Sequence, residues 1–181
     1  MPEVLKDATA KGAHGADLEL AQRVQTLIAD IEARGEAAVR EMSANFDSWD
    51  PEQFRLTSEE IEAIVAGVDP STVKDIRFAQ TQIRTFAEAQ MKSLSDIEVE
   101  TLPGVILGHK NIPVSAVGAY VPGGRYPMVA SAHMSVLTAK VAGVPRVAAC
   151  TPPINGAIPA ETVTAMHLAG ADEIYLLGGV Q

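Results

Sequence analysis

Apolar side chains recur at helical spacing through the first half of the chain. Gly35 and the segment at 47–51 interrupt the pattern in the way that a helix end and a turn do. Thr57 and Glu60 have the spacing of a capping box, and Asp69-Pro70 offers a cap followed by a first helical residue. The sequence therefore predicts four helices, at about 17–34, 36–46, 58–68 and 70–92.

The hydrophobic period changes after Ser95. Apolar and polar residues alternate on both sides of the Leu102-Pro103-Gly104 turn, which predicts a β-hairpin. Residues 116–121 are almost continuously apolar, which is typical of a strand buried on both faces of a parallel sheet. Further on, strands alternate with helices, at about 129–142 (helix), 146–150 (strand), 159–169 (helix) and 173–177 (strand). This order predicts right-handed crossovers and an open parallel sheet, so the expected fold class is α/β.

The chain stops at Gly178-Gly179-Val180-Gln181, where an alternating pattern calls for another helix. A three-stranded sheet with one bare flank would leave apolar surface in water. We therefore expect the sequence to be the N-terminal part of a longer chain.

Ligands of open parallel sheets bind outside the carboxyl ends of the strands. Three predicted loops lie there, at 122–128, 151–156 and 178–181. The first begins with Pro122, Gly123 and Gly124, and its glycines tolerate unusual dihedrals and leave the backbone open to a phosphate or a ring. A helix N-terminus follows, which favours an anion. The alternative is an ordinary strand-to-helix loop without a ligand.

Four side chains near these loops are candidates for binding. Tyr120 ends the first parallel strand and can stack on a cofactor, unless it only fills the core. Arg125 offers a planar fork for a carboxylate, sulfonate or phosphate, unless water alone solvates it. His133 lies in the first turns of the next helix, where it can face the same crevice. Gln181 can hold a ribose or an amide, unless it is a solvated chain end.

The net charge and the single cysteine exclude several kinds of partner and site. The net charge of -9 and the pI near 4.8 disfavour nucleic acid or an anionic membrane as partner. The single cysteine excludes an internal disulfide, and no signal peptide or membrane-spanning run is evident, so we expect a cytoplasmic protein. The sequence contains no recognisable catalytic constellation, no metal-ligand spacing of histidines and no Gly-x-Gly-x-x-Gly motif.

Four motifs in order resemble the histidinol dehydrogenase family: residues 117–124 (VGAYVPGG), 139–144 (AKVAGV), 150–153 (CTPP) and 177–181 (LGGVQ). Residues 35–40 and 46–49 are similar to the family as well, so the resemblance covers essentially the whole chain. It implies an enzyme that uses zinc and NAD to oxidise a primary alcohol through an aldehyde to a carboxylate. It also implies an intertwined homodimer built on incomplete Rossmann-like domains.

The resemblance carries over to particular positions. Tyr120 and Gln181 match residues that contact NAD in the family, and Pro122, Gly123 and Gly124 form the accompanying cofactor loop. We expect an N-terminal helical region with the hairpin at 1–115, followed by an incomplete Rossmann-like NAD-binding domain at 116–181. The family's zinc ligands and its Glu-His catalytic pair lie beyond this chain. No catalytic or metal-binding residue is therefore assigned, and the chain alone is expected to be inactive.

One departure from the common family pattern concerns the substrate. Arg125-Tyr126-Pro127-Met128 follows the glycines, and His133 replaces a more usual aliphatic residue. This pattern is similar to the branch that oxidises sulfopropanediol, and Arg125 and His133 suit an anionic substrate better than a cationic amino alcohol. Two alternatives remain, namely histidinol oxidation in histidine synthesis and a non-catalytic nucleotide-binding or dimerisation module.

Overall fold

The structure is a computed structural model that describes residues 13–123 and 126–180. Gly124, Arg125 and Gln181 lie outside the described residues, so the predictions made for them remain predictions. The chain divides into two compact units, Met1–Glu41 and Met42–Gln181. The predicted boundary at 115/116 separates a helical region from an NAD-binding domain. The division into compact units does not test it, so it stays a prediction. Helices and strands follow the predicted order, which confirms the α/β class.

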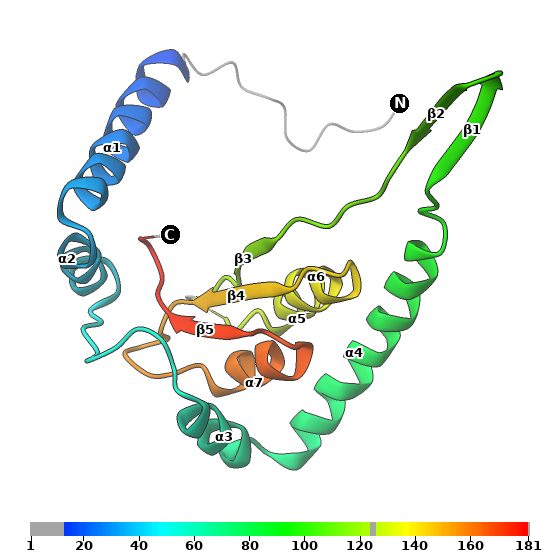
Figure 1. The fold of residues 1–181 in the computed structure, drawn as a ribbon. Helices are drawn as coiled ribbons and strands as arrows, with labels where there is room; N and C mark the ends of the chain where they lie inside the picture. The colour runs from blue at the N-terminus through cyan, green and yellow to red at the C-terminus, as the bar shows by residue number, and fades with distance from the viewer. Residues whose placement is uncertain (1–12, 124–125, 181) are drawn as a thin grey trace, which may run out of the picture. The chain divides into compact units, whose positions relative to one another are not determined.

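The first unit consists of α1 (Ala13–Arg34) and the beginning of α2 (Glu36–Asp47), shown in blue in Figure 1. Gly35 joins them with a φ of +58°, a left-handed conformation that suits glycine. Arg34 donates from Nε to Asp30 at 2.7 Å and from Nη1 to Glu41 at 2.8 Å. The guanidinium therefore connects the last turn of α1 to the start of α2.

The second unit begins with the end of α2 and continues through α3 (Ser58–Gly67) and α4 (Pro70–Met91). The predicted capping box is confirmed, because the Glu60 N–H donates to Thr57 Oγ1 at 3.2 Å and the Thr57 N–H donates to Glu60 Oε2 at 2.7 Å. Asp69 caps α4 by accepting the Ser71 N–H at 2.8 Å. The antiparallel hairpin of β1 (Ile97–Leu102) and β2 (Val105–His109) follows, also as predicted.

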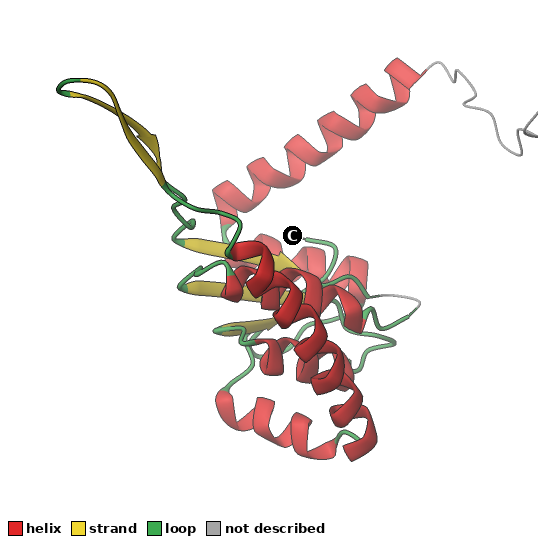
Figure 2. Cartoon of the chain, turned by 90° about the vertical axis from the view of Figure 1, so that its right-hand side faces the viewer, coloured by secondary structure: helices red, strands yellow, loops and turns green. Residues whose placement is uncertain are grey.

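The predicted parallel sheet is present, in the order β3-β4-β5 (Figures 1 and 2). Its strands are β3 (Ala116–Tyr120), β4 (Arg146–Thr151) and β5 (Glu173–Leu176). The first crossover helix is irregular, with α5 (Val129–Ala132), a π-helical segment η1 (His133–Leu137) and α6 (Thr138–Val141) in succession. The second crossover helix is α7 (Ala160–Ala169), which contacts η1, β4 and β5.

Within the described part of the second unit, the crossover helices lie on one face of this sheet. Ala119, Val147 and Ile174 are buried toward the helices, whereas Gly118 and Arg146 on the other face are exposed. The prediction that residues 116–121 are buried on both faces is therefore wrong. Successive right-handed crossovers in one direction place both helices on the same side of the sheet, so the second face, called the open face below, stays bare.

The outer edge of β5 is closed by a segment that the sequence did not predict. The Leu56 N–H donates to the Ile174 carbonyl at 2.9 Å, and the Leu176 N–H donates to the Phe54 carbonyl at 2.8 Å. Residues 54–56 thus run antiparallel to β5, with Arg55 opposite Tyr175. At the opposite edge of the sheet, β3 pairs with β4 alone among the described residues.

The buried side of α4 includes one polar residue. Ile76, Gln80 and Ala87 are its buried side chains, and the helix contacts η1, α6 and α7. Phe86, which falls on the expected apolar seam, is instead 67% exposed. Within the part of the chain that the structure describes, no helix has both the length and the apolar character that crossing a bilayer requires.

Candidate functional site

The three predicted loops start at one edge of the sheet. Parallel pairing aligns Tyr120 with Cys150 and Cys150 with Tyr175. Beyond the strands, the Val121 N–H donates to the Cys150 carbonyl at 2.8 Å, and the Leu177 N–H donates to the Thr151 carbonyl at 2.9 Å. The carboxyl ends of β3, β4 and β5 therefore form a common rim from which all three loops leave, as the sequence pattern predicted.

Pro152 packs the three loops together. A Cβ added at Gly123 would lie 2.9 Å from Pro152 Cγ, and one added at Gly178 would lie 2.7 Å from Pro152 Cβ. Neither glycine has a positive φ. From the sequence, unusual dihedrals and an open approach to a ligand were expected at Gly123 and Gly124, and Gly124 lies outside the described residues. In the structure, the absent side chains at Gly123 and Gly178 make room for Pro152.

Asp47 at the end of α2 accepts a hydrogen bond from the third loop. Its Oδ2 accepts the Gly179 N–H at 3.1 Å, and a Cβ at Gly178 would lie 2.5 Å from the same oxygen. Gly179 also packs against the ring of neighbouring Phe46. Sequence reasoning placed Asp47 only in a turn and missed its place at the rim. No spacing rule connects residues 47 and 179, so this pair becomes evident only in three dimensions.

Tyr120 projects from the open face of the sheet at the rim. Its side chain is 40% exposed and does not belong to the buried core. Cys150, its neighbour on β4, is half-buried, and this burial raises the pKa of the thiol. The ring is thus accessible to a ligand, and its contact with NAD stays a prediction. Pro122, which follows the strand, is half-buried at the same rim.

His133 has a different environment from the one expected. Its side chain is only 5% exposed, and its Nδ1 lies 3.2 Å from Nε2 of Gln80 on α4. Burial lowers the pKa of the imidazole, which favours the neutral form. Because Arg125 lies outside the described residues, its position relative to His133 is not described, and the pairing of these two residues at a substrate stays a prediction. Substrate binding by His133 stays a prediction.

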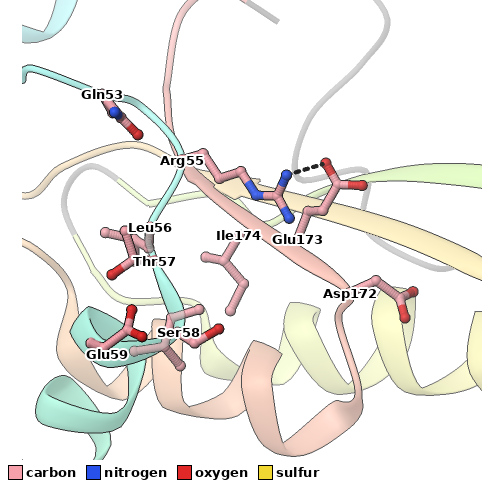
Figure 3. Close-up of a pocket in the computed structure, with 10 residues that line it drawn as sticks. Gln53, Arg55, Leu56, Thr57, Ser58, Glu59, Asp172, Glu173 and Ile174 are labelled. Carbon is pink, nitrogen blue, oxygen red and sulfur yellow. Dashed lines mark ion pairs between the residues drawn. The ribbon is translucent and has the colours of Figure 1, made fainter.

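A concave region lies away from the rim, at the amino-terminal end of β5 (Figure 3). This cavity of about 380 Å³ is lined mainly by residues 53–59 and 172–174. On its edge, Glu173 accepts hydrogen bonds from Arg146 and from the Tyr175 hydroxyl, both at 2.6 Å, and Arg55 lies 3.7 Å away. Arg146 and Tyr175 lower the pKa of Glu173 to about 2. These charged groups already have partners within the chain.

No three His, Cys, Asp or Glu side chains gather as a possible metal site within residues 13–123 and 126–180. The groups present there do not fit a zinc ion. His109 is exposed on the hairpin with Nε2 near the Ser95 carbonyl, and His167 is exposed on α7.

The family model that matches this chain and the proteins that resemble it agree with one another. The family model described as histidinol dehydrogenase matches residues 11–181. A histidinol dehydrogenase homolog from Shouchella clausii is 67% identical over 175 residues, covering 97% of this chain and 41% of that protein. The sulfopropanediol 3-dehydrogenase of Ruegeria pomeroyi is 46% identical over 180 residues, covering 99% of this chain and 41% of that protein.

A solved structure agrees with the sequence relatives. The crystal structure of histidinol dehydrogenase from Elizabethkingia anophelis superposes with a TM-score of 0.81 at 27% identity, covering 97% of this chain and 39% of that one. The chain therefore spans about two fifths of the length of these relatives. Family members are dehydrogenases. The match of the family model to residues 11–181 shows that this chain belongs to the histidinol dehydrogenase family.

Proposed function

We propose that the complete protein is an NAD- and zinc-dependent dehydrogenase that oxidises a primary alcohol through an aldehyde to a carboxylate. The main support is the common rim at the carboxyl ends of β3, β4 and β5. Three backbone loops meet there around Pro152, and an aromatic ring stands exposed at the end of β3. Rims of this kind are where open α/β sheets bind dinucleotides. This chain would supply the cofactor half of the site.

Tyr120 and the loop of Pro122, Gly123 and Gly124 are the proposed NAD ligands, together with Gln181. The ring at Tyr120 supplies a flat apolar surface and a hydroxyl, which suit a nucleotide base or ribose. Val129 begins α5 five residues after Gly124, and a crossover helix that follows a parallel strand begins on the side of the rim, where its first amide groups have no helical partner. NAD, when bound, supplies the hydride acceptor. The proposal places no zinc ligand and no proton-transferring residue on this chain.

An anionic diol such as sulfopropanediol is the proposed substrate. Its sulfonate would meet the guanidinium of Arg125, whose planar donors match a tetrahedral anion. The 46% identity to a protein named sulfopropanediol 3-dehydrogenase supports this choice over histidinol, since a protein named histidinol dehydrogenase from Methanosarcina barkeri is 38% identical. Direct contact between His133 and the substrate would require its ring to become more accessible than 5%.

A homodimer of the complete protein is the proposed assembly. Apolar side chains on both strands of the hairpin are between 43% and 66% exposed, namely Ile97, Val99, Leu102, Val105, Ile106 and Leu107. A run of this kind on a two-stranded hairpin needs a further surface to cover it. Light scattering of the complete protein measures the assembly, and a monomer at micromolar concentration would contradict it.

The substrate proposal is tested by turnover. The complete protein, supplied with zinc and NAD, is assayed for reduced nicotinamide with sulfopropanediol and with histidinol. We expect a higher kcat/KM for sulfopropanediol, and Arg125→Met should raise its KM with little effect on histidinol. Faster turnover of histidinol would instead favour histidine synthesis. No turnover of either alcohol, with tight NAD binding retained, would favour a non-catalytic nucleotide-binding module.

The cofactor proposal is tested at Tyr120. Loss of base stacking is worth about 1–3 kcal/mol, so Tyr120→Ala should weaken NAD binding roughly tenfold while the melting temperature changes little. Phe78→Ala is the control, because it removes another exposed aromatic ring, 67% exposed against 40% for Tyr120, from α4. If the Tyr120→Ala variant and its parent bind NAD with equal affinity, the proposed contact between Tyr120 and NAD is wrong and the ring only packs within the protein.

A further inference from the structure

The helix that follows the Tyr120 loop contains an unusual segment. Residues His133–Leu137 are π-helical, between α5 and α6. Two hydroxyls bond to carbonyls of the preceding turn, from Ser135 to Ser131 at 2.6 Å and from Thr138 to Met134. Such widened turns are rare and occur often at functional sites.

Gln80 provides a buried polar contact at this point. Its side chain is 6% exposed, and its Nε2 lies 2.8 Å from the Ala165 carbonyl oxygen of α7. A carbonyl oxygen only accepts hydrogen bonds, so the amide nitrogen must occupy this position and the amide orientation is settled. The same nitrogen lies 3.2 Å from Nδ1 of His133, at the start of η1. One amide group therefore connects α4, α7 and η1.

The chemistry of these contacts determines the protonation state of the imidazole. Both protons on Gln80 Nε2 are donated, one to the Ala165 carbonyl and one to His133. Nδ1 of His133 must then accept, which leaves the ring proton on Nε2. A proton on Nδ1 would place two donors 3.2 Å apart in a region that excludes water. The Ala165 carbonyl of α7 thus fixes the orientation of the Gln80 amide, and this amide in turn fixes the tautomer of His133.

We propose that Gln80 is a positioning residue for the cofactor loop. By fixing His133 as its Nε2–H tautomer and bonding to α7, it holds the π-helical segment, and with it the start of α5 and the preceding residues 126–128. The tautomer assignment is independent of function. The step from loop geometry to NAD affinity rests on the proposed function.

The first test reads the tautomer directly. The complete protein is labelled with ¹⁵N-histidine, and long-range ¹H–¹⁵N spectra are assigned through loss of the His133 signals in His133→Asn. We expect the Nε2–H pattern in the parent and in Gln82→Met, an exposed glutamine of the same helix. In Gln80→Met the pattern should change to a mixture of tautomers. An Nδ1–H pattern in the parent would overturn the assignment, and an unchanged Nε2–H pattern in Gln80→Met would overturn the role of Gln80 in fixing the tautomer. The parent spectrum alone decides if Gln80→Met does not fold.

The second test separates positioning from function. Amide exchange of a peptide spanning 117–133 should be faster in Gln80→Met than in Gln82→Met, whether or not NAD is present. NAD affinity should fall roughly tenfold, with kcat at saturating NAD within about twofold, because the change acts on binding geometry. Unchanged exchange would overturn the positioning role. Faster exchange in a protein whose parent does not bind NAD would overturn the proposed function and leave the positioning role standing.

Discussion

Replacing Gly178 by alanine tests whether the rim is packed as tightly as its distances imply. The new Cβ would lie 2.5 Å from Asp47 Oδ2 and 2.7 Å from Pro152 Cβ. The Asp47 carboxylate can rotate away, but it then loses its bond to the Gly179 N–H. The Pro152 Cβ belongs to a rigid ring and moves only with its backbone. Gly178→Ala therefore forces one of the loops to shift.

The expected cost follows from these two effects. Overpacking a close contact costs about 1–3 kcal/mol, and losing a hydrogen bond to a charged group costs about 1.5–3 kcal/mol. Alanine stabilises through the unfolded state by about 0.4–1 kcal/mol, which offsets part of this loss. With both costs present, we expect a net destabilisation of roughly 1.5–5.5 kcal/mol in the free energy of unfolding, measured by urea denaturation.

Gly118→Ala is the matched control for this change. Gly118 lies on β3 of the same sheet, also without a positive φ, and an added Cβ there meets nothing within 4 Å. Its free energy of unfolding should stay constant or increase by up to about 1 kcal/mol. A Gly178→Ala variant as stable as Gly118→Ala would refute the tight packing of the rim. NAD binding by both variants then reports whether the same packing matters to the cofactor.

Three further changes test other parts of the chain. Thr57→Ala removes the capping box of α3 and should cost about 1 kcal/mol in urea unfolding; an unchanged midpoint would contradict the cap. Gly35→Ala places a side chain at a φ of +58° with no steric neighbour, so backbone strain alone should cost about 1 kcal/mol, whereas Gly35→Asn should cost less. The pKa of Glu173 is lowered from 4.5 to about 2, so its stabilising contribution is complete above pH 4.5 and is lost as the pH falls toward 2. Glu173→Gln should therefore flatten the pH dependence of the unfolding midpoint in that window, and an unchanged profile would contradict the contribution of Glu173.

Much of the fold was predictable because local signals and tertiary structure agree. The cap at Thr57 and the proline after Asp69 set helix starts through contacts within one turn, which a sequence shows directly. The alternation of strands and helices after residue 116 likewise predicted the parallel order and the shared rim. These features depend on neighbours in sequence or on general rules of chirality.

The remaining features depend on contacts between distant residues. Residues 54–56 pair with β5 across more than a hundred positions, and three residues carry no readable period. Gln80 falls four residues after Ile76, on the buried seam of α4, so its position was available from helical spacing. Its partners on η1 and α7 were not, and neither was the π-helical segment that His133 begins.

Closure of β5 by residues 54–56 also restricts how the sheet can grow. Among the described strands, the outer edge of β3 is the place where a further parallel strand could pair. A chain leaving β5 would have to cross back over the sheet to pair there, which would reverse the direction of winding. A three-residue stretch of backbone before α3 thus limits lateral growth of this sheet to the side of Tyr120.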